Sequence, residues 1–366
     1  MSTLPSSLDP SSGGLQSHDK ISTDDAFLGH FPAGSHIVSI TQFGPVAWKI
    51  TAKLTVGLPD GTRKQYFLKT STGPRGKLMV EGEFHAMSEI YRTMPNFAPK
   101  PYAWGKYSLA KEPETYFFLS DFISMDENLP EPTQLCSKLV QLHLNSVSPT
   151  GKFGFSVTTC QGSTPQAAGW DSSWTGFFSK LLRHVLELDT QTNGRWVQLD
   201  VLSHRILFEV VPRLIGALET KGRRVKPSLI HGDLWEGNIG TLAETGDINI
   251  FDAAAFYAHN EMEIGGWRCN YNKIHDKVYT DAYLQLCPPS EPQEEWEDRN
   301  RMYSIYYNVI FSVNHKDQGT AVRQMAYDDM YFLLDKYTPF APGEGPPKLT
   351  ESERVSLSDE RDHTRN

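Results

Sequence analysis

Residues 229–240 read LIHGDLWEGNIG, and this short stretch decides the fold. Between two apolar flanks it carries a histidine (His231), a carboxylate (Asp233), a tryptophan (Trp235) and an amide (Asn238). A loop that only reverses the chain needs little more than Gly, Ser, Asn or Asp. Because SLIHG has the pattern of a short strand that runs into a loop, we expect these polar side chains to be presented at the end of a strand.

The residues that follow predict a hairpin. AETGD at 243–247 lies between two short apolar runs, as a turn between paired strands does. Such a hairpin brings Asp252 back beside Asn238. A carboxylate and an amide oxygen at one loop mouth suit Mg²⁺, which takes one or two protein oxygens besides phosphate and water. Asp and Asn often only cap turns, but the spacing of Asp233, Asn238 and Asp252 together favours a chemical site.

Composition excludes several classes of protein. The 366 residues are 39% hydrophobic and 22% charged, which is typical of a globular chain long enough for two sub-domains. No apolar run is long enough to cross a membrane, and the first residues lack the pattern of a signal peptide, so we expect a cytoplasmic protein. A formal net charge of −9 argues against nucleic acid as a partner. The four cysteines form no CxxC pair, which argues against a zinc site or a disulfide framework.

The distribution of apolar residues predicts an α+β protein of two lobes with a cleft between them. Residues 1–25 and 341–366 are poor in apolar side chains and are expected to be disordered tails. Residues 26–123 combine strand patterns, including KQYFLKT at 64–70, with one amphipathic helix at 77–94, which indicates an antiparallel sheet. Residues 124–340 have mainly helical patterns. The acidic run EPQEEWEDRNR at 291–301 is expected to form a solvated helix face.

The loop resembles the catalytic loop of protein kinases, H-R-D-L-x-x-x-N, which is followed by a metal-binding Asp. The resemblance implies a bilobal protein kinase-like fold, with a small antiparallel-sheet N-lobe and a mainly helical C-lobe. It implies that Asp233 is the catalytic base and that Asn238 and Asp252 are metal ligands. Gly232 stands where protein kinases have the Arg, and Ala253 and Ala254 follow Asp252 in place of Phe and Gly. These departures favour a small-molecule kinase of the same fold.

More narrowly, the chain resembles the fructosamine kinase (ketosamine-3-kinase) family. The resemblance rests on HGDLWEGN, on FDAAAFYAHNEMEI at 251–264 and on GKFGFSVTTCQGSTPQ at 151–166 with WTGFF downstream, and it covers about residues 69–315. Aminoglycoside and choline kinases share the HGD and Asn positions but continue differently after them. The Trp that follows HGDL is the most diagnostic residue.

For the nucleotide, the resemblance implies that Lys69, on a predicted strand, holds the α- and β-phosphates of ATP. Glu83 on the following helix is the expected partner of its ammonium group, with Glu81 and Glu89 as alternatives. The expected hinge is formed by Asp121, Phe122 and Ile123, whose backbone groups would bind adenine. The segment SITQFGPVAWKI at 39–50 offers only Gly44 and no GxGxxG, so the phosphates must be held by a different backbone arrangement.

For the acceptor, we expect Trp235 to stack on the substrate. His259 and Glu261 match the family pattern YxHxExE and are candidates for substrate contact, with a role in holding the loop as the alternative. His231 is expected to brace the loop rather than to react.

The resemblance implies ATP- and Mg²⁺-dependent phosphorylation of the 3-hydroxyl of a ketosamine, meaning a ribulosamine or fructosamine adduct on lysine or on a free amine. In that family the 3-phosphate makes the adduct unstable, so the amine is released and the protein is deglycated. Two alternatives stay open here, namely another small-molecule kinase of the aminoglycoside or choline kinase type and a non-catalytic kinase-like binding protein. Ribulosamine versus fructosamine preference and the oligomeric state are not determined by the sequence.

Overall fold

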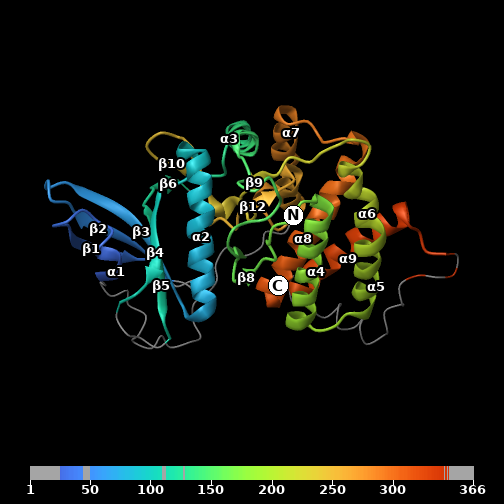
Figure 1. The fold of residues 1–366 in the computed structure, drawn as a ribbon, viewed down its shortest axis with the longest axis horizontal. Coiled ribbons are helices and arrows are strands. Elements are labelled where there is room, and N and C mark those ends of the chain that lie inside the picture. Colours follow the sequence, from blue (N-terminus) through green and yellow to red (C-terminus); the bar gives the residue numbers. More distant parts are fainter. Residues whose placement is uncertain are drawn as a thin grey trace.

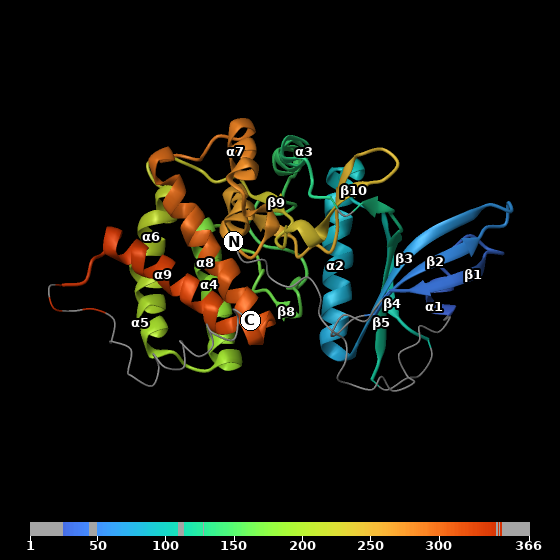
Figure 2. The same ribbon diagram turned by 180° about the vertical axis from the view of Figure 1, so that it is seen from behind.

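The structure is a computed structural model that describes residues 25–43, 50–108, 113–126, 128–341, 343 and 345. Nearly all of the two expected tails lies outside these ranges, and so does Gly44. Figures 1 and 2 show a sheet-containing lobe on one side of the molecule and a helical lobe on the other. The α+β fold with an antiparallel N-terminal sheet is therefore confirmed.

The N-lobe is built on a five-stranded antiparallel sheet in the order β1-β2-β3-β5-β4. Its strands are β1 (His36–Gln42), β2 (Ile50–Gly57), β3 (Arg63–Thr72), β4 (Pro101–Lys106) and β5 (Thr115–Asp121). In the central strand β3, Tyr66 and Leu68 pack into a small core with α1 (Asp25–Leu28). Since side chains alternate along a strand, Phe67 and Lys69 point to the opposite face, toward the second lobe.

Helix α2 (Gly73–Thr93) covers that opposite face and lies between the sheet and the helical lobe (Figure 1). Its buried residues Val80, Glu83, Met87 and Ile90 recur at helical spacing and share one face. Glu83 is the only acidic member of this buried stripe. The amphipathic pattern therefore carries one carboxylate into the interior beside strand β3.

The C-lobe consists mainly of helices. They are α3 (Pro132–Asn145), α4 (Trp174–Asn193), α5 (Val197–Arg205), α6 (Val211–Leu214), α7 (Lys277–Leu286), α8 (Trp296–Asn314) and α9 (Gly319–Tyr337). Short strands pair around the loop of interest: β6 (Met125–Asp126), β9 (Ser228–Ile230), β10 (Ile239–Leu242), β11 (Ile248–Ile250) and β12 (Phe256–Ala258). A two-residue pair, β7 (Cys160–Gln161) and β8 (Thr164–Pro165), lies beside them. The remaining helical segments are η1 (Pro95–Phe97) in the N-lobe and, in the C-lobe, η2 (Ile206–Val210), η3 (Gly216–Glu219), η4 (Glu236–Asn238), η5 (Asn260–Arg268), η6 (Lys273–His275), η7 (Gln293–Glu295) and η8 (Lys316–Gln318).

Helix α8 corrects the expectation for the acidic run at 291–301. The helix begins at Trp296, and Asp298, Arg299 and Asn300 are buried rather than solvated. Arg299 is fully enclosed and forms an ion pair with Glu261. The local charge pattern could not reveal this, because α8 packs between α4, α9 and η5 and its charges find partners on distant segments.

Two further expectations can be compared with the structure. The cysteines Cys136, Cys160, Cys269 and Cys287 are all free. Within the described ranges, no helix is both long and apolar enough to cross a membrane.

Candidate active site

Strand β9 delivers the loop at 231–240 from the interior of the C-lobe. Leu229 and Ile230 are completely buried and pair with β12. At the next turn Gly232 has φ +79°, and a Cβ atom there would lie 2.5 Å from the carbonyl oxygen of Ala254. A side chain is therefore excluded by both conformation and space, which is why glycine occupies the position of the kinase Arg.

His231 braces this loop, as expected. Its Nε2 lies 2.9 Å from the carbonyl oxygen of Phe251, and its Nδ1 accepts a hydrogen bond from the Asp233 backbone N–H at 3.3 Å. Both contacts are satisfied by one neutral tautomer with the proton on Nε2. Burial lowers the pKa of His231, which keeps the ring neutral. The buried Glu263 carboxylate accepts from the backbone N–H groups of His231 and Gly232 and closes the turn.

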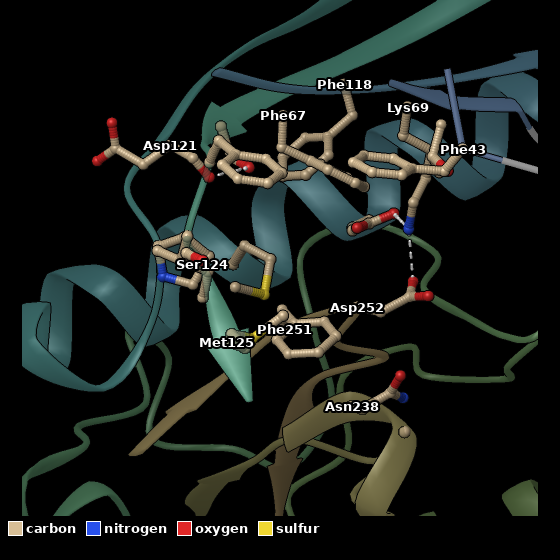
Figure 3. A pocket seen from close by; sticks show the side chains of 18 residues that line it. Phe43, Phe67, Lys69, Phe118, Asp121, Ser124, Met125, Asn238, Phe251 and Asp252 are labelled. Carbon is tan, nitrogen blue, oxygen red and sulfur yellow. Dashed lines mark hydrogen bonds and ion pairs between the residues drawn. The ribbon is translucent and has the colours of Figure 1, made fainter. Parts of the chain in front are cut away.

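The predicted hairpin is present. Ile239 of β10 pairs with Ile250 of β11, and the Phe251 N–H donates to the Asn238 carbonyl oxygen at 3.0 Å. Asp252 is thereby returned to the side of Asn238 (Figure 3). Asp252 has φ +59°, a left-handed conformation that is uncommon for a residue other than glycine. Such conformations cluster at functional sites because the surrounding structure must enforce them.

A buried ion-pair network joins the two lobes at this point. Lys69 Nζ lies 2.6 Å from Glu83 Oε2 and 2.7 Å from Asp252 Oδ1 (Figure 3). Burial by itself would lower the pKa of Lys69, but the Asp252 and Glu83 carboxylates outweigh it and hold the pKa above its ordinary value. Glu83 is thus the partner among the three acidic candidates on the helix. Glu89 instead binds Arg92 and the Tyr257 hydroxyl.

A cavity of about 400 Å³ opens between the lobes beside this network. That volume falls in the range of small-molecule binding sites. Lys69, Asn238 and Asp252 form a polar end of the cavity (Figure 3). The apolar side chains that line the cavity are those of Phe43, Phe67, Met87, Phe118, Met125 and Phe251.

The expected hinge residues Asp121, Phe122 and Ile123 form one edge of the cavity. The Asp121 carboxylate is used elsewhere, since it lies 3.0 Å from Lys64 Nζ and accepts from the Tyr102 hydroxyl at 2.8 Å. Its side chain is therefore held by the N-lobe, and the Asp121 and Phe122 N–H groups donate to the Lys100 and Gln65 carbonyl oxygens of the same lobe. Phe122 stacks on Phe43 with 6.1 Å between ring centroids.

Asp233 is held by two amide groups. Gln161 Nε2 donates to its Oδ1 at 3.0 Å, and Asn238 Nδ2 donates to its Oδ2 at 3.2 Å and to its backbone oxygen at 2.8 Å. Because the amide hydrogens of Asn238 are used within the loop, its oxygen is the atom that a metal could bind.

The donor set near the cavity fits a hard cation. Among the described residues, no three His, Cys, Asp or Glu side chains gather into a metal-binding group. Asn238 and Asp252 offer one amide oxygen and one carboxylate. This small set of oxygen ligands suits Mg²⁺ when phosphate and water supply the rest of its coordination.

Trp235 lies on the surface of the loop. Its side chain is 41% exposed, and its indole covers Gly237, where a Cβ atom would come within 2.3 Å of the ring. The glycine thus leaves room for the six-membered ring of the indole against the backbone.

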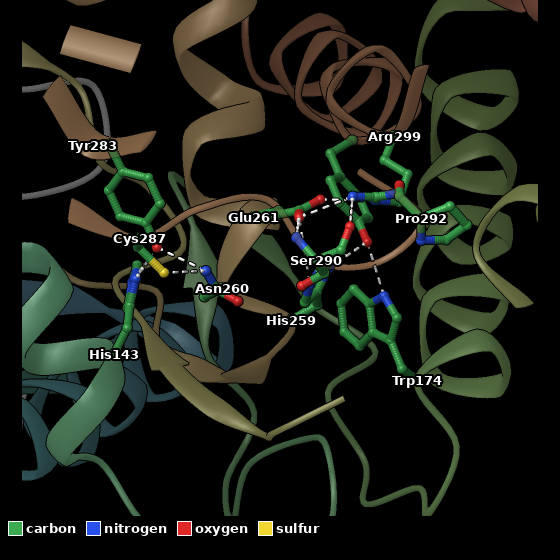
Figure 4. A network of polar contacts seen from close by, with 11 residues as sticks. His143, Trp174, His259, Asn260, Glu261, Tyr283, Cys287, Ser290, Pro292 and Arg299 are labelled. Carbon is green, nitrogen blue, oxygen red and sulfur yellow. Dashed lines mark hydrogen bonds and ion pairs between the residues drawn. The ribbon is translucent and has the colours of Figure 1, made fainter. Parts of the chain in front are cut away.

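His259 and Glu261 are not at a surface that a substrate could reach, so the expectation of substrate contact is wrong. Each is 2% exposed. His259 lies 2.9 Å from both the Tyr303 hydroxyl and Ser290 Oγ, and Glu261 binds Arg299 at 2.8 and 3.0 Å (Figure 4). The alternative considered from the sequence, a role in holding the structure, fits this network. The pattern YxHxExE could not separate the two because Arg299 lies 38 residues away.

Glu263, the last residue of the pattern YxHxExE, holds the loop backbone, which is the alternative that the sequence offered for this pattern. Gln161, which contacts Asp233, has no role predicted from the sequence. Gln161 belongs to the stretch at 151–166, which was singled out only as a pattern. A glutamine carries no charge or metal-ligand signature, so nothing in its local sequence pointed to the carboxylate 72 residues away.

Comparison with known proteins gives concordant results. Residues 49–324 match the family model of the fructosamine kinases. A chloroplastic protein-ribulosamine 3-kinase of Oryza sativa subsp. indica is 32% identical over 275 residues, which cover 74% of this chain and 72% of the relative.

Solved structures share the fold. A Thermobifida fusca YX-ER1 protein provisionally named fructosamine-3-kinase superposes with a TM-score of 0.65 at 19% identity, over 84% of this chain and 97% of its own. A thermostable aminoglycoside phosphotransferase in a ternary complex with AMP-PNP and hygromycin B has a TM-score of 0.57 at 15% identity, over 81% and 94% of the two chains. The kinase-like fold expected from the loop is confirmed by these similarities.

Proposed function

The chain belongs to the fructosamine kinase family, and from that premise we propose that it transfers the γ-phosphoryl group of ATP to the 3-hydroxyl of a ketosamine. Membership of this family makes it an ATP-dependent phosphotransferase with an alcohol acceptor. The acceptors are ribulosamine or fructosamine adducts on lysine or on small amines. Phosphorylation at this position labilises the adduct, so the amine is released and the protein is deglycated.

The ion-pair network of Lys69 is the observation in the site that supports this proposal. The Lys69 ammonium group bridges Glu83 of the N-lobe and Asp252 of the C-lobe at the polar end of the cavity. Asn238 lines the same end and also donates to Asp233. A nucleotide whose phosphates lay against Lys69 would therefore direct its terminal phosphate toward Asp233.

In this arrangement each residue has a defined task. Backbone groups at 121–123 bind the adenine, and the apolar walls of the cavity exclude water around it. Lys69 binds the α- and β-phosphates. Asn238 and Asp252 would hold Mg²⁺, which neutralises charge on the β- and γ-phosphates when bound. Asp233 orients the acceptor hydroxyl and takes its proton at a carboxylate oxygen. Positioning and electrostatics supply most of the rate enhancement.

The acceptor specificity is tested by presenting purified protein and ATP with ribulosyl-lysine, fructosyl-lysine, choline and an aminoglycoside. We expect a 3-phosphate on the two ketosamines, detected by ³¹P NMR, and none on choline or the aminoglycoside. Phosphorylation of choline or the aminoglycoside alone would contradict the ketosamine assignment. Absence of turnover with every acceptor would favour a binding protein.

The assignment of the base is tested by Asp233→Asn. General base catalysis contributes about 10²- to 10⁴-fold, so we expect kcat to fall by at least about 10²-fold. The Kd for ATP, measured by calorimetry, should change little because Lys69 and Asp252 are retained. Normal turnover in the Asn variant would rule out Asp233 as the base.

We propose that the exposed indole of Trp235 packs against the sugar or its alkyl amine. Trp235→Ala should raise KM for the ketosamine while KM for ATP stays unchanged. Since the side chain is 41% exposed, the free energy of unfolding should change little. Equal ketosamine KM values for the two proteins would remove Trp235 from the acceptor site.

The cytoplasmic location also stays a proposal. The rice relative is named as chloroplastic, and fractionation of cells that produce this protein would decide the compartment.

A further inference from the structure

Gln161 lies at the end of β7, in a short hairpin with β8, and its side chain contacts the proposed base. Its Nε2 lies 3.0 Å from Asp233 Oδ1. The second carboxylate oxygen of Asp233 accepts from Asn238. Each oxygen of the carboxylate therefore has one amide donor, and the two donors come from separate segments of the chain.

The orientation of the Gln161 amide is set by this contact. An ionised carboxylate only accepts hydrogen bonds, so the amide must present its NH₂ group to Asp233. Its Oε1 is then turned away, is buried and has no hydrogen-bond partner within the described part of the chain.

The hairpin that carries Gln161 is tied to helix α8. Asn314 Nδ2 donates to the Gln161 carbonyl oxygen at 3.0 Å, and Asn314 Oδ1 accepts from the Ser163 N–H at 3.2 Å and the Thr164 hydroxyl at 2.9 Å. Gly162, which follows Gln161 in the turn of this hairpin, has φ +56°, the left-handed conformation that tight two-residue turns favour. The backbone at Gln161 is therefore anchored by a neighbouring helix.

We propose that Gln161 is a positioning residue, which holds the Asp233 carboxylate in one orientation toward the acceptor hydroxyl. Gln161 and Asn238 each donate to one oxygen of the carboxylate and so restrict its rotation about the Cβ–Cγ bond. Misplacement of a reacting group by about 1 Å can cost about 10²-fold in rate. The inference rests on the proposed function, because it takes Asp233 as the base.

The test compares Gln161→Met and Gln161→Glu with the unaltered protein. Methionine keeps the length of the side chain but removes both polar atoms, so kcat should fall about 10- to 100-fold while both KM values stay within about twofold. The Tm of the Met variant should stay unchanged, because the hairpin is anchored through the Gln161 carbonyl oxygen and Asn314, and methionine keeps this contact. Glutamate places a carboxylate against Asp233 in place of a donor, and its kcat should be lower than that of the Met variant. Single-turnover measurements by rapid quench ensure that phosphoryl transfer and not product release is compared.

Ser163→Ala is the matched control, since it alters a side chain in the same hairpin that does not contact Asp233, and its kcat should be unchanged. A Met variant with full kcat would overturn the inference. So would a Met variant whose Tm falls together with its kcat, because that result shows a structural role. An unaltered protein that phosphorylates no ketosamine would refute the proposed function and this inference with it, whereas active wild type beside a fully active Met variant refutes the inference alone.

Discussion

Lys69 carries a positive charge in the interior of the molecule, and the two carboxylates that surround it make this possible. An isolated buried ammonium group would lose its proton, but Glu83 and Asp252 hold the pKa of Lys69 above its ordinary value despite burial. Glu83 itself is only 7% exposed and depends on Lys69 as its partner. The three residues therefore form one electrostatic unit across the cleft.

Lys69→Met should lower the free energy of unfolding by about 3–5 kcal/mol, because it removes the buried ammonium group that binds both Glu83 and Asp252. Urea denaturation measures this change. The double variant Lys69→Met with Glu83→Leu should recover most of the loss, since both buried charges are then gone, yet it should transfer no phosphate. A single variant as stable as the unaltered protein would show that Glu83 finds another partner or is neutral.

The loop between β9 and β12 shows how one element sets the site. The backbone of Gly232 lies directly against the backbone of Ala254. The segment that carries Asp233 is therefore packed against the segment that carries Asp252. The Phe251 carbonyl and the Ala254 N–H both bind His231, which ties the same two segments. The proposed base Asp233 and the proposed metal ligand Asp252 thus belong to one packed unit, not to two independent loops.

Gly232→Ala should lower the free energy of unfolding by about 1–3 kcal/mol through strain at positive φ, with a further cost from the contact with Ala254. It should also lower kcat, because Asp233 follows directly. Gly246→Ala is the control: this residue in the β10–β11 turn has φ +72°, but a Cβ there meets nothing within 4 Å. The Gly246→Ala variant should lose stability through the same strain at positive φ, but its kcat should equal that of the unaltered protein. Equal kcat values for both variants would argue that the close approach at Gly232 does not position Asp233.

At the scale of the whole molecule, the buried polar network around Glu261 joins η5, α8 and the segment at 287–292 (Figure 4). Burial lowers the pKa of His259 to about 4. The ring is therefore neutral in the folded state at neutral pH, and its two nitrogens serve the Tyr303 and Ser290 hydroxyls. The network stabilises the C-lobe that carries the catalytic loop.

This network predicts loss of stability in acid. The unfolded chain binds a proton at His259 near pH 6.5, whereas the folded chain binds it only near pH 4. Stability is complete above about pH 6.5 and falls as the pH drops toward 4, by up to about 3 kcal/mol from this residue. The measurement is the free energy of unfolding against pH for the unaltered protein and for His259→Gln, which cannot titrate. The difference between the two should change across this window, and parallel curves would contradict the assignment to His259.

The division of the chain into lobes at residues 26–123 and 124–340 stays a prediction, which limited proteolysis of the native protein can test. The oligomeric state is a separate question that sedimentation of the same protein would answer.

Much of this protein was determined by its sequence alone. The two-lobed α+β class follows from alternating and helical periodicities, and the kinase-like fold is implied by the resemblance of the loop at 229–240 to the kinase catalytic loop. Asp233, Asn238 and Asp252 come together through a hairpin that is closed by local turn chemistry. These features depend on residues close along the chain, which is why their spacing reveals them.

Tertiary structure decided the rest. It selected Glu83 as the partner of Lys69, because only that carboxylate lies on the buried stripe of α2. It enclosed His259 and Glu261 in the C-lobe and placed Gln161 against Asp233, 72 residues away. Burial and contacts between distant segments arise from the packing of whole elements, and a local sequence pattern contains no information on what lies opposite a side chain once the chain has folded.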